Sequence, residues 1–269
     1  MIGTQPQGTP HGAPGTYVSF ERQGEVAHIR LNRPDRLNAA SPELVRDFKL
    51  AIERAISERA VVAIIMGEGR AFCAGHDLKA GALAPDSVEA MEHLHRLQDI
   101  TRILRSAAIV SIAAVHGYAL GAGLEFALSC DFIVADEATR FGFPEVSVGL
   151  SVTGGISYLL PQAIGLPMAK ELILLGEPFG AERALALGLV NRVTGPGELL
   201  PVARDIADRL LQKPQHALAL AKESFESAVR AHVETAMALE IDNALLTGDS
   251  TDAGAARSEF ATKGQGSPL

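Results

Sequence analysis

The sequence lacks the features of a disulfide-rich secreted protein and those of a membrane protein. Its 269 residues include only two cysteines, Cys73 and Cys130, which are too few for a disulfide framework. No apolar run reaches the roughly 18 residues that a membrane-spanning helix needs. Residues 1–15 contain neither a basic segment nor an apolar core, so we expect no secretory signal there. These absences favour a reducing, cytoplasmic setting and no membrane partner.

An excess of basic residues is also absent. The chain carries 24 Lys and Arg against 32 Asp and Glu, a net charge of −8, and the basic residues are interleaved with acidic ones. Nucleic-acid binding depends largely on lysine and arginine contacts to phosphates, which usually appear as a basic excess or stripe. We therefore expect no nucleic-acid partner. The hydrophobic share of 47% and the charged share of 21% are those of an ordinary globular protein.

Composition and periodicity divide the chain into regions. Residues 1–15, rich in Gly, Pro, Thr and Gln, predict a flexible tail. Residues 16–198 predict an α/β core, in which strands expected at 61–66, 109–116 and 131–136 alternate with turns and helices. These strands are almost wholly apolar, which is typical of a sheet that helices cover on both sides.

The first helix of the core is predicted to begin after Ser41. A serine is a favourable N-cap, and Pro42 suits the first helical position. Every fourth residue is then apolar, at Leu44, Phe48, Ile52 and Ile56. That spacing predicts an amphipathic helix packed against the sheet.

Residues 199–269 have a different character. Helices are predicted at 199–212, 215–230 and 232–247, with a short one near 252–262, and no strand pattern separates them. We expect this C-terminal helical region to serve assembly.

The stretch GRAFCAGHDLK, residues 69–79, follows the predicted strand at 61–66 with small and polar residues. One reading is a nucleophile, Cys73, with His76 and Asp77 as its base and orienting acid. A triad needs a histidine that touches both partners, and adjacent residues rarely achieve this. The favoured readings are a buried, inert Cys73 and backbone N–H groups left bare for a ligand.

A second glycine-rich stretch, HGYALGAGLEFALSCD at residues 116–131, leads from a strand into a helix. Phe126 stands where a dinucleotide-binding fingerprint would have its third glycine, so that motif is not favoured. Free N–H groups collect at such a helix start. If the turns at 74–76 and 121–123 face each other, one N–H from each could bind a single carbonyl oxygen as an oxyanion hole. Tight helix packing is the alternative for either stretch alone.

Two carboxylates stand in apolar surroundings. Glu125 lies one turn into the predicted helix, and Glu145 follows Pro144 in FGFPEVSVGL. Burial beside another carboxylate raises a pKa, so one group can hold a proton while the other is ionised. Such a pair can orient water and move protons; two exposed charges are the alternative. No metal site is expected, because His93 and His95 lie only two residues apart and point to different faces of a helix.

Taken in order, RPDRLNAAS, AFCAGHDLK, HGYALGAGLE, FGFPEVSVGL and LGLVNRV resemble the crotonase superfamily, and within it the enoyl-CoA hydratases. The resemblance covers about residues 17–263. It implies a crotonase-like spiral of repeated β-β-α units, followed by a helical region that builds a homotrimer or a hexamer. It also implies an acyl-CoA thioester as substrate, with coenzyme A as part of that substrate and no separate cofactor.

The resemblance also implies roles for site residues. The amides of His76 and Ala122 would hold the thioester oxygen. Glu125 would help to activate a water molecule for attack on the β-carbon, and Glu145 would exchange the proton at the α-carbon. Hydratases usually have a small residue at position 76 and glycine at position 122, so this chain departs at both. A double-bond isomerase using one glutamate, and a non-catalytic CoA-binding or RNA-associated member, are the alternatives.

Substrate-binding positions carry over from the same motifs. They are Arg36, Leu37, Ala74, Gly75, His76, Asp77, Leu78, Lys79, Gly121 and Lys263. For the basic residues a solvated surface charge is the alternative. The segment Ser151-Val152-Thr153 replaces the usual Gly-Pro-containing turn at the acyl pocket, which leaves the acyl group and the reaction subtype open.

Overall fold

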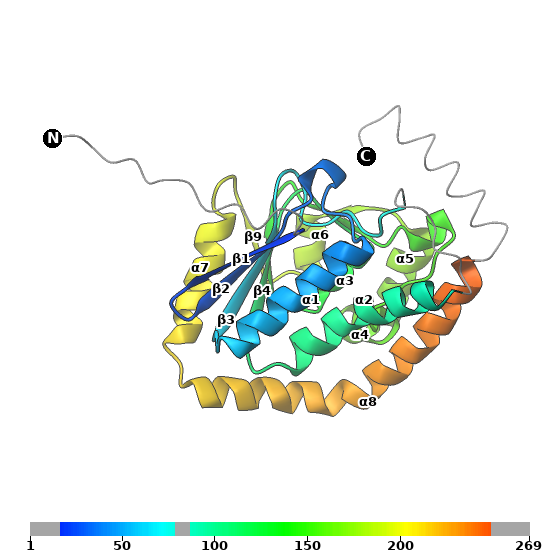
Figure 1. The fold of residues 1–269 in the computed structure, drawn as a ribbon. Helices are drawn as coiled ribbons and strands as arrows, with labels where there is room; N and C mark the ends of the chain where they lie inside the picture. The colour runs from blue at the N-terminus through cyan, green and yellow to red at the C-terminus, as the bar shows by residue number, and fades with distance from the viewer. Residues whose placement is uncertain (1–16, 79–86, 249–269) are drawn as a thin grey trace.

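The computed structural model describes residues 17–78 and 87–248 (Figure 1). Its main sheet has six strands in the order β1-β2-β3-β4-β6-β9. The first two strands pair antiparallel, and the others pair in parallel. The strands of this sheet are β1 (Val18–Gln23), β2 (Val26–Leu31), β3 (Val62–Gly67), β4 (Val110–Val115), β6 (Phe132–Asp136) and β9 (Arg192–Thr194).

A second, smaller sheet explains why the chain forms a spiral. It contains β5 (Tyr118–Leu120), β7 (Arg140–Gly142) and β8 (Phe179–Gly180), in that order. The chain passes from β4 in the large sheet to β5 in the small one and then into α3 (Ala122–Leu128), and it repeats the step from β6 to β7. The predicted crotonase-like spiral with a C-terminal helical region is confirmed.

Helices cover both faces of the main sheet, as the apolar strands predicted. On one face, Ala63 and Ile65 of β3 pack in a core with Phe48 of α1 (Pro42–Ser57) and Leu97 of α2 (Val88–Ser106). The other face packs against α7 (Leu199–Leu211). Each large buried side chain contributes about 1.5–3 kcal/mol, so this layering accounts for much of the stability of the core.

The helix predicted after Ser41 begins there. The Ser41 hydroxyl accepts a hydrogen bond from the amide of Leu44 at 3.3 Å, and Pro42 occupies the first turn. Residues Leu44, Phe48 and Ile52 are buried against the sheet. The remaining helical elements are η1 (Pro34–Arg36), η2 (Glu145–Val148), α4 (Ile156–Ile164), α5 (Leu166–Leu175) and α6 (Ala181–Ala186).

The C-terminal region differs from the prediction in one respect. The helices expected at 215–230 and 232–247 form a single helix, α8 (Gln215–Gly248). The predicted break was wrong because the segment contains neither glycine nor proline before Gly248, so nothing local interrupts the helix. The helix expected near 252–262 lies outside the described residues.

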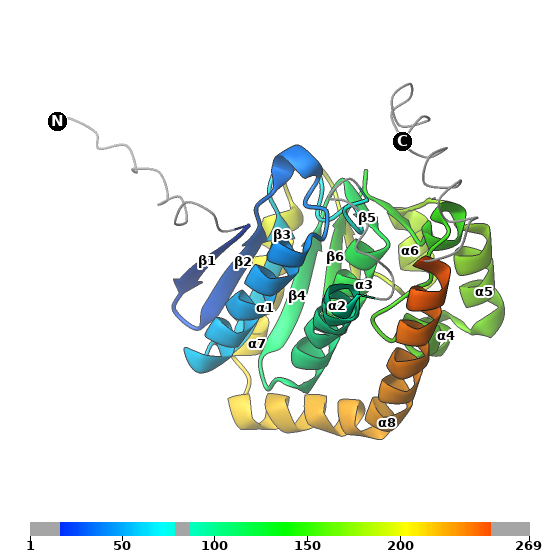
Figure 2. The same ribbon diagram turned by 45° about the vertical axis from the view of Figure 1, so that its right-hand side comes forward.

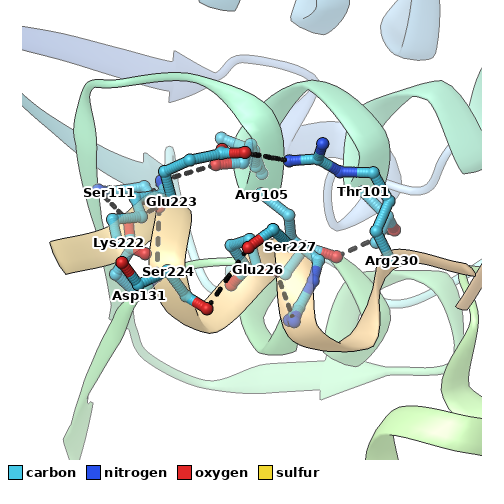
Figure 3. Close-up of polar contacts among 12 residues, drawn as sticks. Thr101, Arg105, Ser111, Asp131, Lys222, Glu223, Ser224, Glu226, Ser227 and Arg230 are labelled. Atoms are coloured by element: carbon cyan, nitrogen blue, oxygen red, sulfur yellow. Dashed lines mark hydrogen bonds and ion pairs between the residues drawn. The ribbon is translucent and has the colours of Figure 1, made fainter. Parts of the chain in front are cut away.

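Helix α8 is also fixed within the protomer. Figure 2 shows it passing below the core and rising beside α4. The ammonium group of Lys222 donates to the carbonyls of Leu104 and Ile109 and to Asp131 at 2.7–2.8 Å, and Arg105 pairs with Glu226 at 2.6 Å (Figure 3). The boundary at residue 198 and the assembly role stay predictions. No helix in the described part of the chain is long and apolar enough to cross a membrane.

Candidate active site

The turn at residues 74–76 is held by pairing with Ala40. The amide of Ala40 donates to the Gly75 carbonyl at 2.8 Å, and the amide of Asp77 donates to the Ala40 carbonyl at 3.4 Å. In such a parallel bridge the amide of the middle residue points away from the partner strand. The N–H of His76 therefore faces away from Ala40, and it donates to no backbone carbonyl within the described residues.

The turn at residues 121–123 presents a second free amide. Gly121 has φ 49° and ψ −125°, and α3 begins at Ala122. Because Ala122 is the first helical residue, its N–H has no acceptor inside the helix. Glycine is required here, since this backbone conformation is strained for a residue with a side chain.

The structure brings these two turns together. A β-carbon on Gly75 would lie 2.9 Å from the Leu120 carbonyl oxygen, and one on Gly121 would lie 3.8 Å from the Gly75 α-carbon. The two backbones are therefore in van der Waals contact. Only residues without side chains at these two positions permit so close an approach.

Glu145 lies over the second turn. It opens η2, its side chain is buried, and its Oε1 would be 2.7 Å from a β-carbon on Gly121. Neither carboxylate oxygen has a hydrogen-bond partner among the described residues. Burial raises the pKa of Glu145, and the nearby Glu125 carboxylate raises it further. An unpartnered buried carboxyl group is costly for stability, which is typical of a group kept for a ligand or a reaction.

Glu125 has a different environment. It is 2% exposed on α3, and Thr153 donates to both of its oxygens. The Thr153 amide reaches Oε1 at 2.8 Å, and the Thr153 hydroxyl reaches Oε2 at 2.6 Å. Burial raises the pKa of Glu125, while the two hydrogen bonds from Thr153 act in the opposite direction. The two carboxylates therefore share a site but differ in what stabilises their charge.

Sequence reasoning missed two residues here. It noted the segment 151–153 as a departure from the usual turn, but not that Thr153 binds Glu125. It did not single out Glu240, which is buried on α8 and accepts hydrogen bonds from the Gly155 amide and from Ser157. An acid within the apolar stretch AMALEIDNALL was the available signal for Glu240.

The side chains of Cys73 and His76 do not form a triad. Cys73 is fully buried, and burial raises the pKa of its thiol to about 12. A thiol with so high a pKa is a poor nucleophile at neutral pH. The His76 ring packs edge-on against His93 with 6.0 Å between ring centroids, and burial lowers the pKa of His76 to about 4. The ring is therefore neutral.

Of the other predicted substrate-binding residues, four lie in the described part of the chain and two lie outside it. Leu37 lies beside the first turn, since its carbonyl accepts from the Ala74 amide at 3.0 Å, and Arg36 is exposed at the end of η1. Asp77 forms an ion pair with Arg33, and Leu78 is exposed. Lys79 and Lys263 lie outside the described residues. Within residues 17–78 and 87–248 no group of side chains is arranged to hold a metal ion.

Comparison with known proteins gives a consistent result. The sequence profile described as enoyl-CoA hydratase/isomerase matches residues 21–267. A crotonyl-CoA hydratase of Syntrophomonas wolfei is 35% identical over 84% of this chain and 87% of its own. A short-chain-enoyl-CoA hydratase of Clostridium acetobutylicum is 33% identical over 83% of this chain and 86% of its own.

Solved structures agree. The crystal structure of an enoyl-CoA hydratase from Mycobacterium avium subsp. paratuberculosis superposes with a TM-score of 0.84 at 27% identity. That superposition covers 93% of this chain and 97% of the other. With the profile match extending over nearly the whole sequence and the spiral fold shared, the chain belongs to the enoyl-CoA hydratase/isomerase family.

Proposed function

We propose that this protein is an enoyl-CoA hydratase, a hydro-lyase that adds water across the 2,3 double bond of an enoyl-CoA thioester. The observation that carries the proposal is the pair Glu125 and Glu145, buried together beside two amides that no backbone carbonyl of residues 17–78 and 87–248 engages. The hydratase names of relatives about 35% identical support it.

The two amides supply the electrophilic part of the site. The thioester oxygen accepts from the N–H groups of His76 and Ala122, and negative charge develops on this oxygen when water attacks the β-carbon. Fixed donors aimed at such a charge lower the barrier, and losing one typically costs about 2.7–4 kcal/mol. The His76 ring is neutral and packs against His93, so in this proposal His76 contributes only its backbone amide to binding the thioester oxygen.

The two carboxyl groups move the protons, and the atoms balance as follows. Glu125 starts ionised and Glu145 protonated. Glu125 takes one proton from water as the oxygen bonds to the β-carbon, and Glu145 gives its proton to the α-carbon. One molecule of water has then been added, and the proton on the pair has moved from Glu145 to Glu125. Exchange between the two groups restores the starting state before the next turnover.

The coenzyme A portion extends from the first turn. Ala74 and Leu37, which are joined by a backbone hydrogen bond, line its path, and the exposed guanidinium of Arg36 meets a phosphate. Lys79 and Lys263 are further candidates from the family resemblance. Asp77 has a positioning role instead, because its carboxylate is paired with Arg33. The functional unit is a homotrimer or a dimer of trimers in the cytoplasm, acting in acyl-CoA catabolism.

Water labelled with oxygen-18 tests the reaction directly. Purified protein incubated with crotonyl-CoA in labelled water should give a 3-hydroxyacyl-CoA that carries one labelled oxygen. Release of free fatty acid, or no reaction with short, medium and aromatic enoyl thioesters, would sink the hydratase proposal.

A double-bond isomerase is the second candidate. The observation that favours it is the asymmetry of the pair. Thr153 engages both oxygens of Glu125, while Glu145 has no hydrogen-bond partner in the part of the chain that the structure describes. An isomerase needs a single base to carry a proton between carbons. In labelled water a 3-enoyl thioester would then become a 2-enoyl thioester without any labelled oxygen.

A further inference from the structure

The charge on Glu125 has no cation to balance it in the described part of the chain. The titratable groups that face it are Glu145 from η2, Glu240 from α8 and the Cys73 thiol. Each of these is negative or neutral at neutral pH. Burial and the two other carboxylates all favour a proton on Glu125, so hydrogen-bond donors must act against them if it is to be ionised.

Thr153 supplies those donors. Its amide and its hydroxyl each donate to a different oxygen of Glu125, at 2.8 Å and 2.6 Å. Hydrogen bonds to a charged acceptor are about twice as strong as those between neutral groups. Both donors of Thr153 therefore stabilise the ionised form of Glu125. Glu145 receives no such donor among the described residues. The surroundings of the two residues therefore favour an ionised Glu125 and a protonated Glu145.

The turn that carries Thr153 is fixed from its other side by Glu240. One oxygen of Glu240 accepts from the Gly155 amide at 2.7 Å, and the other accepts from the amide and hydroxyl of Ser157 at 2.8 Å and 2.6 Å. Gly154 and Gly155 both have positive φ, 68° and 77°, so the chain reverses sharply between the two acids. Helix α8, through Glu240, thereby fixes the turn whose Thr153 donates to Glu125 of α3.

We infer that Thr153 is a positioning residue that assigns the negative charge of the pair to Glu125 and leaves the proton on Glu145, with Glu240 fixing the turn that presents it. The inference rests on the proposed function, because the assignment matters only if Glu125 accepts a proton from water. It gives the Ser151-Val152-Thr153 departure a consequence: the threonine hydroxyl adds a donor that glycine at this position could not supply.

The test compares Thr153→Val with Thr153→Ser and a matched control. Valine keeps the shape and the amide but removes the hydroxyl, and serine restores the hydroxyl. The control is Thr101→Val, because Thr101 is also buried near Gly154 but its hydroxyl is paired with Ser129 rather than with a carboxylate. The measured quantities are kcat and KM for crotonyl-CoA between pH 5 and 9.

Removing a donor to the ionised form raises the pKa of Glu125, so the acidic limb of the kcat profile should move to higher pH. We expect Thr153→Val to move it by about one pH unit, the scale of one charged hydrogen bond, with KM nearly unchanged. Below the limb kcat should fall about tenfold, since the ionised fraction falls tenfold per pH unit. Thr153→Ser should restore the limb, and Thr101→Val should leave it in place. A loss of thermal stability without movement of the limb, or failure of serine to restore it, overturns the inference.

A second measurement needs no turnover. In wild-type protein with carboxyl-labelled glutamate, the carbon resonances of Glu125 and Glu145 are assigned with Glu125→Gln and Glu145→Gln, and Glu125 should lose its proton at a lower pH than Glu145. A Glu125 that keeps its proton to a higher pH than Glu145 overturns the inference whatever the activity. Suppose that labelled water shows no hydration, but Glu125 is ionised before Glu145 and its pKa depends on Thr153. The proposed function then fails and the charge assignment stands.

Discussion

Glu145 Oε1 lies where Gly121 has no room for a side chain: a β-carbon there would be 2.7 Å from that oxygen. The same glycine precedes Ala122, whose amide is the second proposed oxyanion donor. The proposed proton donor and the proposed oxyanion turn therefore lie so close together that only a residue without a side chain fits at position 121.

Gly121→Ala should thus damage the site in two ways. The backbone at φ 49° and ψ −125° is strained for alanine, at about 1–3 kcal/mol, and the methyl group displaces the Glu145 carboxyl. We expect kcat to fall about 100-fold, the scale of a catalytic group misplaced by about 1 Å.

Gly24→Ala separates strain from displacement. Gly24 has φ 62°, but a β-carbon there meets nothing within 4 Å, so this variant should lose some stability and keep its kcat. Equal activity losses in both variants would show that strain alone is responsible and that the contact with Glu145 is unimportant.

Glu125 and Glu145 should act as one unit. Replacing either by Gln keeps its size but removes its capacity to exchange a proton, and hydration should fall by roughly two to four orders of magnitude. The double variant should be far less than multiplicatively worse, because groups that share one step are not additive. Binding of butyryl-CoA by calorimetry is the fold control. Wild-type hydration in Glu125→Gln would refute the two-carboxylate mechanism.

The stability of Glu145→Gln should depend on pH with a definite sign. Folding raises the pKa of Glu145 above its usual 4.5, so the folded state binds the proton more tightly than the unfolded state. The destabilisation caused by ionised Glu145 is absent below about pH 4.5. It grows as the pH rises above that value and is complete once the pH exceeds the raised pKa of the folded state. The glutamine variant should therefore gain about 1–3 kcal/mol over wild type at pH 8 and much less at pH 5.

Urea unfolding at both pH values and one protein concentration measures this difference. The concentration is held fixed because assembly would otherwise alter the apparent stability. A difference between variant and wild type that is the same at pH 5 and pH 8 would contradict the buried, unpartnered state of Glu145.

Glu240→Ala should cost far more stability than a surface acid on the same helix. It leaves the buried amide of Gly155 without its acceptor, at about 1–3 kcal/mol, and it removes the acceptor of the amide and hydroxyl of Ser157, which is exposed and can bind water instead. Glu234→Ala is the control, since its side chain is 46% exposed in an ion pair with Arg102 and should change stability by less than about 1 kcal/mol. Similar melting temperatures for the two variants would show that the hydrogen bonds of Glu240 contribute little to stability.

Cys73→Ser should leave turnover within about tenfold of wild type, a barrier change of about 1.4 kcal/mol or less. Burial holds the thiol protonated, and no histidine among the described residues is one of the groups that shift its pKa. Steady-state kinetics of the folded variant decide the point. A loss of several orders of magnitude would revive Cys73 as a nucleophile.

Local sequence determined the elements that depend on neighbours along the chain. The Ser41 cap, the apolar spacing after it and the two-sided apolar run of β3 each arise within a few residues, so periodicity and capping sufficed to find them. The two glycine turns and the two carboxylates were also found as motifs, with the family supplying their roles.

Only the tertiary structure decided how those motifs differ from one another. Thr153 reaches Glu125 across 28 residues and Glu240 reaches Gly155 across 85, and no local propensity encodes such contacts. They exist because α8 packs against α4 as an unbroken helix and because Gly154 and Gly155 turn the chain between the two acids. The sequence alone determined that two acids were present, and packing decided which of them has donors for a negative charge.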